Sequence, residues 1–182
     1  MEYTPGVRTD TDYTNATLGL YFVPDENMVL ATEEEMNLML QSSASMVYGD
    51  QPNGDALLDH AMQATTYEMM AVNVLDGSNV LFSNEKLSME GITESLYLDI
   101  LTQQLDALDT SLDITYEKLG TVTLGDTDFA GLTYTLSNQG AQASQTVLIK
   151  KVADRMCSVS LSYADAAAYD ALLECFHPIS SL

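Results

Sequence analysis

Residues 114–163 read ITYEKLGTVTLGDTDFAGLTYTLSNQGAQASQTVLIKKVADRMCSVSLSY, and this stretch decides the fold. It contains runs rich in Thr, Val, Ile, Leu and Tyr, residues that favour β-strands. The segments GDTD, SNQG and VAD between these runs are typical of turns. Connections this short join antiparallel neighbours. The stretch therefore predicts an antiparallel meander with strands at about 114–124, 129–136, 143–151 and 155–163.

A hairpin is predicted upstream of the meander, in residues 67–87. Two β-rich runs flank Asp76 and Gly77, a pair that favours the positive φ angles of a type I′ turn. Nearer the N-terminus, the segment PDEN separates two shorter apolar runs. We expect these runs to form strands at about 16–24 and 28–31.

Three amphipathic helices are expected, at about 33–47, 93–108 and 166–176, because apolar residues recur there at helical spacing. Residues 56–63 can add one or two helical turns. Three successive glutamates open the first helix. Thr32 and Glu35 have the spacing of a capping box, and Glu33 and Glu34 suit the positive end of the helix dipole. The glutamates are therefore predicted to start a helix and not to form a metal or acid–base site.

Several strands are apolar on both faces. In residues 67–74, Met69 and Ala71 point to one side while Met70 and Val72 point to the other. A sheet with two apolar faces needs cover on both. The predicted fold class is α+β, a mostly antiparallel six- to seven-stranded sheet sandwiched between helices in α/β/α layers.

The chain length of 182 residues suits one domain with a sizeable core. The N-terminal residues are rich in Thr and Asp, without the alternation of a long strand. We expect residues 1–14 to be a polar tether and residues 15–182 to form a single domain.

The charge balance excludes two classes of partner. Twenty-seven acidic residues face six basic ones, giving a formal net charge of -21. Such a surface repels both nucleic-acid phosphates and anionic lipids. No apolar run approaches the roughly 20 residues of a membrane span, so direct membrane insertion by this domain is not expected. No signal peptide is visible, which leaves two readings: a cytoplasmic protein, or a mature exported domain.

No catalytic residues, metal ligands or cofactor are predicted, and the protein is not expected to be an enzyme. His60 adjoins Asp59, but successive helical residues point about 100° apart and make a poor dyad. His177 follows the last helix, where histidine commonly binds terminal carbonyls. The sequence contains no nucleophile elbow, phosphate-binding glycine loop or paired zinc-ligand spacing.

Two groups of residues carry alternative interpretations. Lys150, Lys151 and Arg155 flank one turn and make up half of the basic residues. They are a candidate contact patch for an acidic protein partner, or a solvated hairpin tip that protects a strand edge. Cys157 and Cys175 could form a disulfide if the last helix folds back over its preceding strand. The alternative is two buried free thiols.

Residues 18–36 read LGLYFVPDENMVLATEEEM, a strand ending in proline, an acidic turn, a second short strand and a helix start. This order resembles the start of PsbP-like domains of exported lipoproteins from Gram-positive gut bacteria, although Met28 stands where an aromatic residue is expected. Residues 67–88 resemble their central hairpin, 92–108 their long helix and 121–163 their final meander. The resemblance implies the layered fold described above. It also implies a non-enzymatic binding or scaffolding module of an exported, membrane-anchored envelope protein. Relatives with other roles leave an alternative, a cytoplasmic protein-binding adaptor of the same fold.

Overall fold

The computed structural model describes residues 2–48, 53–107 and 113–181. Its main sheet has seven strands in the order β4-β5-β6-β10-β9-β8-β7, and every pairing is antiparallel. The strands are β4 (Met28–Leu30), β5 (Thr65–Asn73), β6 (Asn79–Lys86), β7 (Asp113–Leu124), β8 (Thr127–Asn138), β9 (Ala141–Val152) and β10 (Arg155–Tyr163). The four helices are α1 (Glu33–Tyr48), α2 (Gly54–Ala64), α3 (Glu94–Asp106) and α4 (Ala166–Glu174). The predicted α+β class and meander are confirmed.

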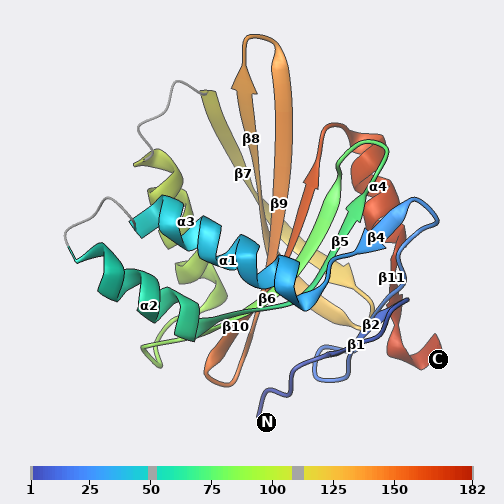
Figure 1. The fold of residues 1–182 in the computed structure, drawn as a ribbon, viewed down its shortest axis with the longest axis horizontal. Helices are drawn as coiled ribbons and strands as arrows, with labels where there is room; N and C mark the ends of the chain where they lie inside the picture. The colour runs from blue at the N-terminus through green and yellow to red at the C-terminus, as the bar shows by residue number, and fades with distance from the viewer. Residues whose placement is uncertain (1, 49–52, 108–112, 182) are drawn as a thin grey trace.

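A second, four-stranded sheet was not expected. It has the order β1-β2-β3-β11, with strands β1 (Val7–Arg8), β2 (Tyr13–Asn15), β3 (Leu20–Phe22) and β11 (Phe176–Pro178). The two ends of the chain thus meet in one small sheet (Figure 1). β3 lies inside the strand expected at about 16–24, but β1, β2 and β11 have only two or three residues, too few to show an alternating pattern, so the sequence did not reveal them.

The prediction that residues 1–14 form a polar tether is wrong. Tyr3 and Tyr13 are only 8% and 1% exposed and belong to the main hydrophobic core. The intervening polar residues form a tight turn, in which the Thr9 hydroxyl donates a 2.7 Å hydrogen bond to the Asp12 carboxylate. The polar composition reflects this turn, while two widely spaced tyrosines anchor the segment.

Alternation along the strands divides the core into two layers. On one face, Leu148 and Cys157 pack with the small sheet and α4. On the other face, Ile149 and Met156 pack with α3. α1 and α2 contact each other and β5, and α1 lies across the sheet in Figure 1. One face of the main sheet is therefore covered by a small sheet as well as a helix, where the sequence predicted helices alone.

The first helix begins as the sequence predicted. The Thr32 amide donates to the Glu35 carboxylate at 2.7 Å, and the Glu35 amide donates to the Thr32 hydroxyl oxygen at 3.2 Å. These two bonds are the reciprocal pair of a capping box. The bonds that the Thr32 amide and hydroxyl donate to the Glu35 carboxylate hold the pKa of Glu35 below its ordinary value. The interpretation of the three glutamates as a helix start is confirmed.

The predicted hairpin forms, but its turn differs. Five residues, 74–78, connect β5 to β6, and the Asn73 amide donates to the Ser78 carbonyl at 2.8 Å. Gly77 has a positive φ of 78° and Asp76 does not, so the turn is not type I′. Two successive positive φ angles occur instead at Gln139 and Gly140, between β8 and β9.

Candidate functional site

Four of the six basic residues gather at one end of the main sheet. Lys86 ends β6 and lies opposite Arg155, the first residue of β10. Lys150 and Lys151 lie near the end of β9, beside the same stretch of β10. We call these four residues the basic end. Lys86 joins this group only because β6 pairs with β10, so the patch predicted from the sequence did not contain it.

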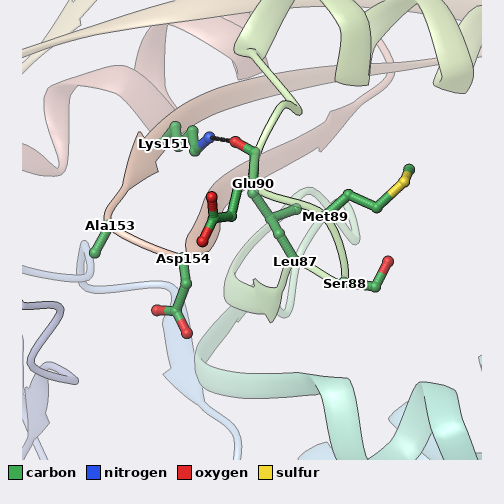
Figure 2. Close-up of a pocket in the computed structure, with 7 residues that line it drawn as sticks. All are labelled: Leu87, Ser88, Met89, Glu90, Lys151, Ala153 and Asp154. Atoms are coloured by element: carbon green, nitrogen blue, oxygen red, sulfur yellow. Dashed lines mark hydrogen bonds between the residues drawn. The ribbon is translucent and has the colours of Figure 1, made fainter.

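Lys151 organises the link between β6 and α3. Its ammonium group donates to the carbonyls of Glu90 at 2.8 Å and Ile92 at 2.7 Å. Its backbone amide donates to the carboxylate of Glu94 in the first turn of α3, at 3.1 Å. Figure 2 shows the Lys151 side chain reaching the Glu90 carbonyl. Lys151 therefore uses its charge mainly to position this link.

A cavity of about 460 Å³ lies between that link and the β9–β10 turn (Figure 2). The side chains that line it come from residues 87–90, from Lys151 and from the turn residues Ala153 and Asp154. A neighbouring hollow of about 380 Å³ is lined by His60, Lys86 and four other residues, and shares residues 87 and 88 with the first. His60 thus lies beside the basic end, on the other side of this shared segment.

Lys150, Lys151 and Arg155 do not form one continuous patch. Lys151 lies opposite Met156, whose side chain belongs to the core layer under α3. Arg155 shares the face of Cys157, which belongs to the opposite layer. The guanidinium of Arg155 donates to the Asn84 side-chain oxygen. The two-residue period of a strand therefore separates charges that are close in sequence.

Asn84, the partner of Arg155, belongs to a polar cluster around Glu68 that the sequence did not predict. Glu68 occupies a β-bulge, where the β5–β6 register shifts between Tyr67 and Met69. Its carboxylate accepts hydrogen bonds from a set of donors on the N-terminal segment and β6. These donors are the Tyr13 hydroxyl at 2.7 Å, the Gly6 amide at 2.7 Å, the Tyr3 hydroxyl and the Asn84 amide group.

Asn15 completes this arrangement. It is fully buried, and its side-chain amide donates to the hydroxyl oxygens of both Tyr3 and Tyr13 at 3.1 Å. We call Tyr3, Tyr13, Asn15, Glu68 and Asn84 the Glu68 cluster. It fastens the N-terminal segment to the main sheet. In the sequence, this cluster is indicated only by Glu68, a single glutamate within the apolar run YEMMAVNV.

Burial is the main cause of the raised pKa values of three groups in and beside the Glu68 cluster. Burial, and then the nearby Glu68 carboxylate, raise the pKa values of Tyr3 and Tyr13 well above their ordinary value. Burial and Glu68 also raise the pKa of Cys157 to about 12. These groups therefore keep their protons to higher pH than exposed phenols and thiols do.

Both cysteines are buried and free. The Cys175 sulfur lies 3.9 Å from the Met28 sulfur and 3.5 Å from the Ala171 carbonyl oxygen. Burial raises the pKa of Cys175 as well. Of the two alternatives left open by the sequence, the structure contains the pair of buried thiols and not the disulfide.

Two kinds of feature are absent from the part of the chain that the structure describes. Within residues 2–48, 53–107 and 113–181, no three His, Cys, Asp or Glu side chains are grouped so that they could hold a metal ion. In the same ranges, no helix has the length and apolar character needed to cross a membrane.

The comparisons with known proteins give distant structural similarity. No family model and no curated protein matches the chain. The solution structure of cyanobacterial PsbP from Synechocystis is similar with a TM-score of 0.43 and 10% identity, covering 98% of each chain. The crystal structure of LpqN, described as involved in cell envelope biogenesis of Mycobacterium tuberculosis, has a TM-score of 0.37 and 13% identity. That match covers 63% of this chain and 78% of LpqN. At these scores, neither similarity assigns the chain to a family or a function.

Proposed function

We propose that this domain is a non-enzymatic binding module whose basic end contacts an acidic segment of a protein partner. The observation that carries the proposal is the grouping of four of six basic residues at one end of a chain of net charge -21. In a strongly acidic molecule, such an end is where carboxylates meet least repulsion. It therefore orients an approaching partner.

Two of the four cations are available for this contact. Lys151 and Arg155 donate to groups of the domain itself. Lys86 is exposed and Lys150 is half-buried, and neither forms an ion pair with another described residue. Met89, which is 62% exposed, adds an apolar contact at the rim of the cavity in Figure 2. A protein segment with carboxylates around one apolar side chain fits this surface.

The cellular setting of the proposal rests on the sequence resemblance to PsbP-like domains. We propose an exported, membrane-anchored envelope protein in which this domain binds or scaffolds a partner outside the cytoplasm. The second candidate is a cytoplasmic adaptor that uses the same surface. Intact mass of the full-length protein from its native cells distinguishes the two. A lipid adduct at an N-terminal cysteine supports the first, and an unmodified chain without an export signal supports the second.

The binding surface is tested with a photo-crosslinking amino acid placed at position 86, 150 or 174 in native cells. Glu174 is the control, because it is exposed and lies on α4, outside the basic end. We expect one protein to crosslink from positions 86 and 150 and not from 174. Binding of that purified protein should then weaken about tenfold in the double variant Lys86→Glu, Lys150→Glu. Unchanged affinity in this variant would refute the basic end as the contact surface.

A further inference from the structure

Strand β7 forms one edge of the seven-stranded sheet. It is twelve residues long and pairs with β8 on one side, and no described strand pairs with its other side. Its two halves differ. Gly120 lies at a register shift between Leu119 and Thr121, and Leu124, at the end of the second half, is buried in the main core. The first half, residues 113–119, is largely exposed.

This first half has the properties of a strand that can accept another strand. It contains no proline, and Thr115, Tyr116, Glu117 and Lys118 are all exposed. An edge strand presents unpaired backbone N–H and C=O groups along its free side. The register shift at Gly120 interrupts the regular ladder with β8, which then continues to Leu124, so residues 113–119 are the longest regular part of this edge.

A side-chain pocket accompanies the edge. A hollow of about 270 Å³ is lined by residues of β7 and β8: Thr115, Tyr116, Glu117, Thr133 and Thr135. Recognition by strand addition combines backbone hydrogen bonds with pockets that receive alternate side chains. The hydroxyls and the carboxylate of this hollow favour a polar or cationic side chain over an apolar one.

The charges around the edge favour a basic occupant. Asp113 and Glu117 lie on the strand itself. On the other face, Lys118 is paired with Asp99 of α3, and the Tyr116 hydroxyl donates to Asp106 at 3.3 Å. The only cation of this half strand is therefore already neutralised, and acidic groups flank it on both faces.

The same charges disfavour a second copy of the chain. In a two-fold antiparallel pair of β7 strands centred on Glu117, this residue would lie opposite Glu117 of the other copy. Each copy also carries a net charge of -21. Like charges opposite one another in a sheet are destabilising.

We propose that residues 113–119 of β7 bind an extended segment of a partner protein with Lys or Arg at alternate positions, by adding it to the sheet as a further strand. This inference does not depend on the basic end, because it concerns a different edge of the sheet and the opposite charge. The backbone of the segment pairs with β7. Its basic side chains lie against Glu117 and the hollow on one face, or near Asp106 on the other.

The probe is the capped peptide acetyl-KTKVKTK-amide, tested with the whole domain at low ionic strength. Saturable binding is measured by calorimetry, and amide hydrogen exchange by NMR locates it. We expect slower exchange of alternate amides within residues 113–119. A peptide methylated on alternate backbone nitrogens keeps its charge but cannot pair with the strand, and it should not bind. Equal binding of the methylated peptide, or protection confined to other strands, would overturn the proposal.

Two variants test the charge argument. Glu117→Lys should weaken binding of the probe about tenfold, whereas Glu174→Lys, a matched change at an exposed position of α4, should weaken it less than about threefold. Circular dichroism checks that both variants fold. Equal losses in the two variants would show attraction by net charge alone and would refute a site at the edge. The free domain could also sediment as a dimer that Glu117→Lys abolishes. That result would overturn the proposal, because it would show that the edge binds a second copy of the chain.

Discussion

The Tyr13 hydroxyl donates a 2.7 Å hydrogen bond to the carboxylate of Glu68, which lies 55 residues further along the chain. This bond joins β2 of the small sheet to the bulge of β5 in the main sheet. Tyr3 and Gly6 donate to the same carboxylate. Glu68 is therefore the point at which the N-terminal segment becomes part of the core.

Replacement of Glu68 should destabilise the domain strongly. In Glu68→Ala, several buried or half-buried donors lose their acceptor, and each unsatisfied donor costs about 1–3 kcal/mol. We expect the free energy of unfolding to fall by about 3 kcal/mol in urea denaturation. The Gly6 amide should also exchange faster with solvent. The exposed control Glu174→Ala should change stability by less than about 0.5 kcal/mol. Equal effects in the two variants would contradict this role.

The buried tyrosines should make the domain sensitive to alkali. In the unfolded chain, each phenol loses its proton near its ordinary pKa of 10.0. In the folded chain, Tyr3 and Tyr13 keep their protons to higher pH, so above pH 10 the folded state binds more protons than the unfolded state. The free energy of unfolding should therefore be unaffected by these groups below pH 10. Above it, stability should fall by up to about 1.4 kcal/mol per pH unit for each phenol.

Tyr13→Phe isolates this effect. The variant loses one hydrogen bond but no longer titrates at this position, so its stability should decline less steeply than that of the parent between about pH 10 and about pH 11. Urea denaturation at a series of pH values measures both slopes. Tyr116→Phe, at an exposed tyrosine of β7, is the control and should keep the parental slope. Parallel curves for Tyr13→Phe and the parent would refute the assignment.

Both thiols should resist modification in the folded protein. Burial and the Glu68 carboxylate raise the pKa of Cys157 to about 12, so its thiolate is rare at neutral or mildly alkaline pH. The pKa of Cys175 is raised as well. Alkylation at about pH 8, followed by intact mass, should be at least about 100-fold slower than in urea. Fast labelling of the folded protein, or a mass lower by two hydrogens before reduction, would contradict the buried free thiols.

Lys151 should control the order of the link between β6 and α3. In Lys151→Met, the aliphatic stem remains but the bonds to the carbonyls of Glu90 and Ile92 are lost. We expect a loss of about 1–2 kcal/mol in unfolding free energy and faster amide exchange in residues 87–93. Lys150→Met removes an equal charge from the next position of β9 and serves as control. Unaltered exchange in residues 87–93 would show that the link does not depend on Lys151.

Local chemistry made much of the fold predictable. Thr32 and Glu35 form the predicted capping box because its bonds join residues three positions apart. β10 spans Arg155–Tyr163 as predicted, because alternating side chains and the adjacent turn both belong to the local sequence. The turn after β5 was mistaken because the pair Asp76 and Gly77 suits more than one loop length. In the structure a five-residue loop forms instead, and the Asn73 amide donates a hydrogen bond to the Ser78 carbonyl.

The sequence by itself determined the α+β class, the meander, the helix starts and the excess of acidic charge, all of which depend on composition or on neighbours along the chain. Only the tertiary structure decided that Tyr3 and Tyr13 are core residues, that Lys86 joins the basic end, and that Lys151 and Arg155 lie on opposite faces. The physical reason is that these relationships arise from strand register and from hydrogen bonds to distant residues. Glu68, for example, is stable in an apolar strand because its partners arrive from the N-terminal segment and β6.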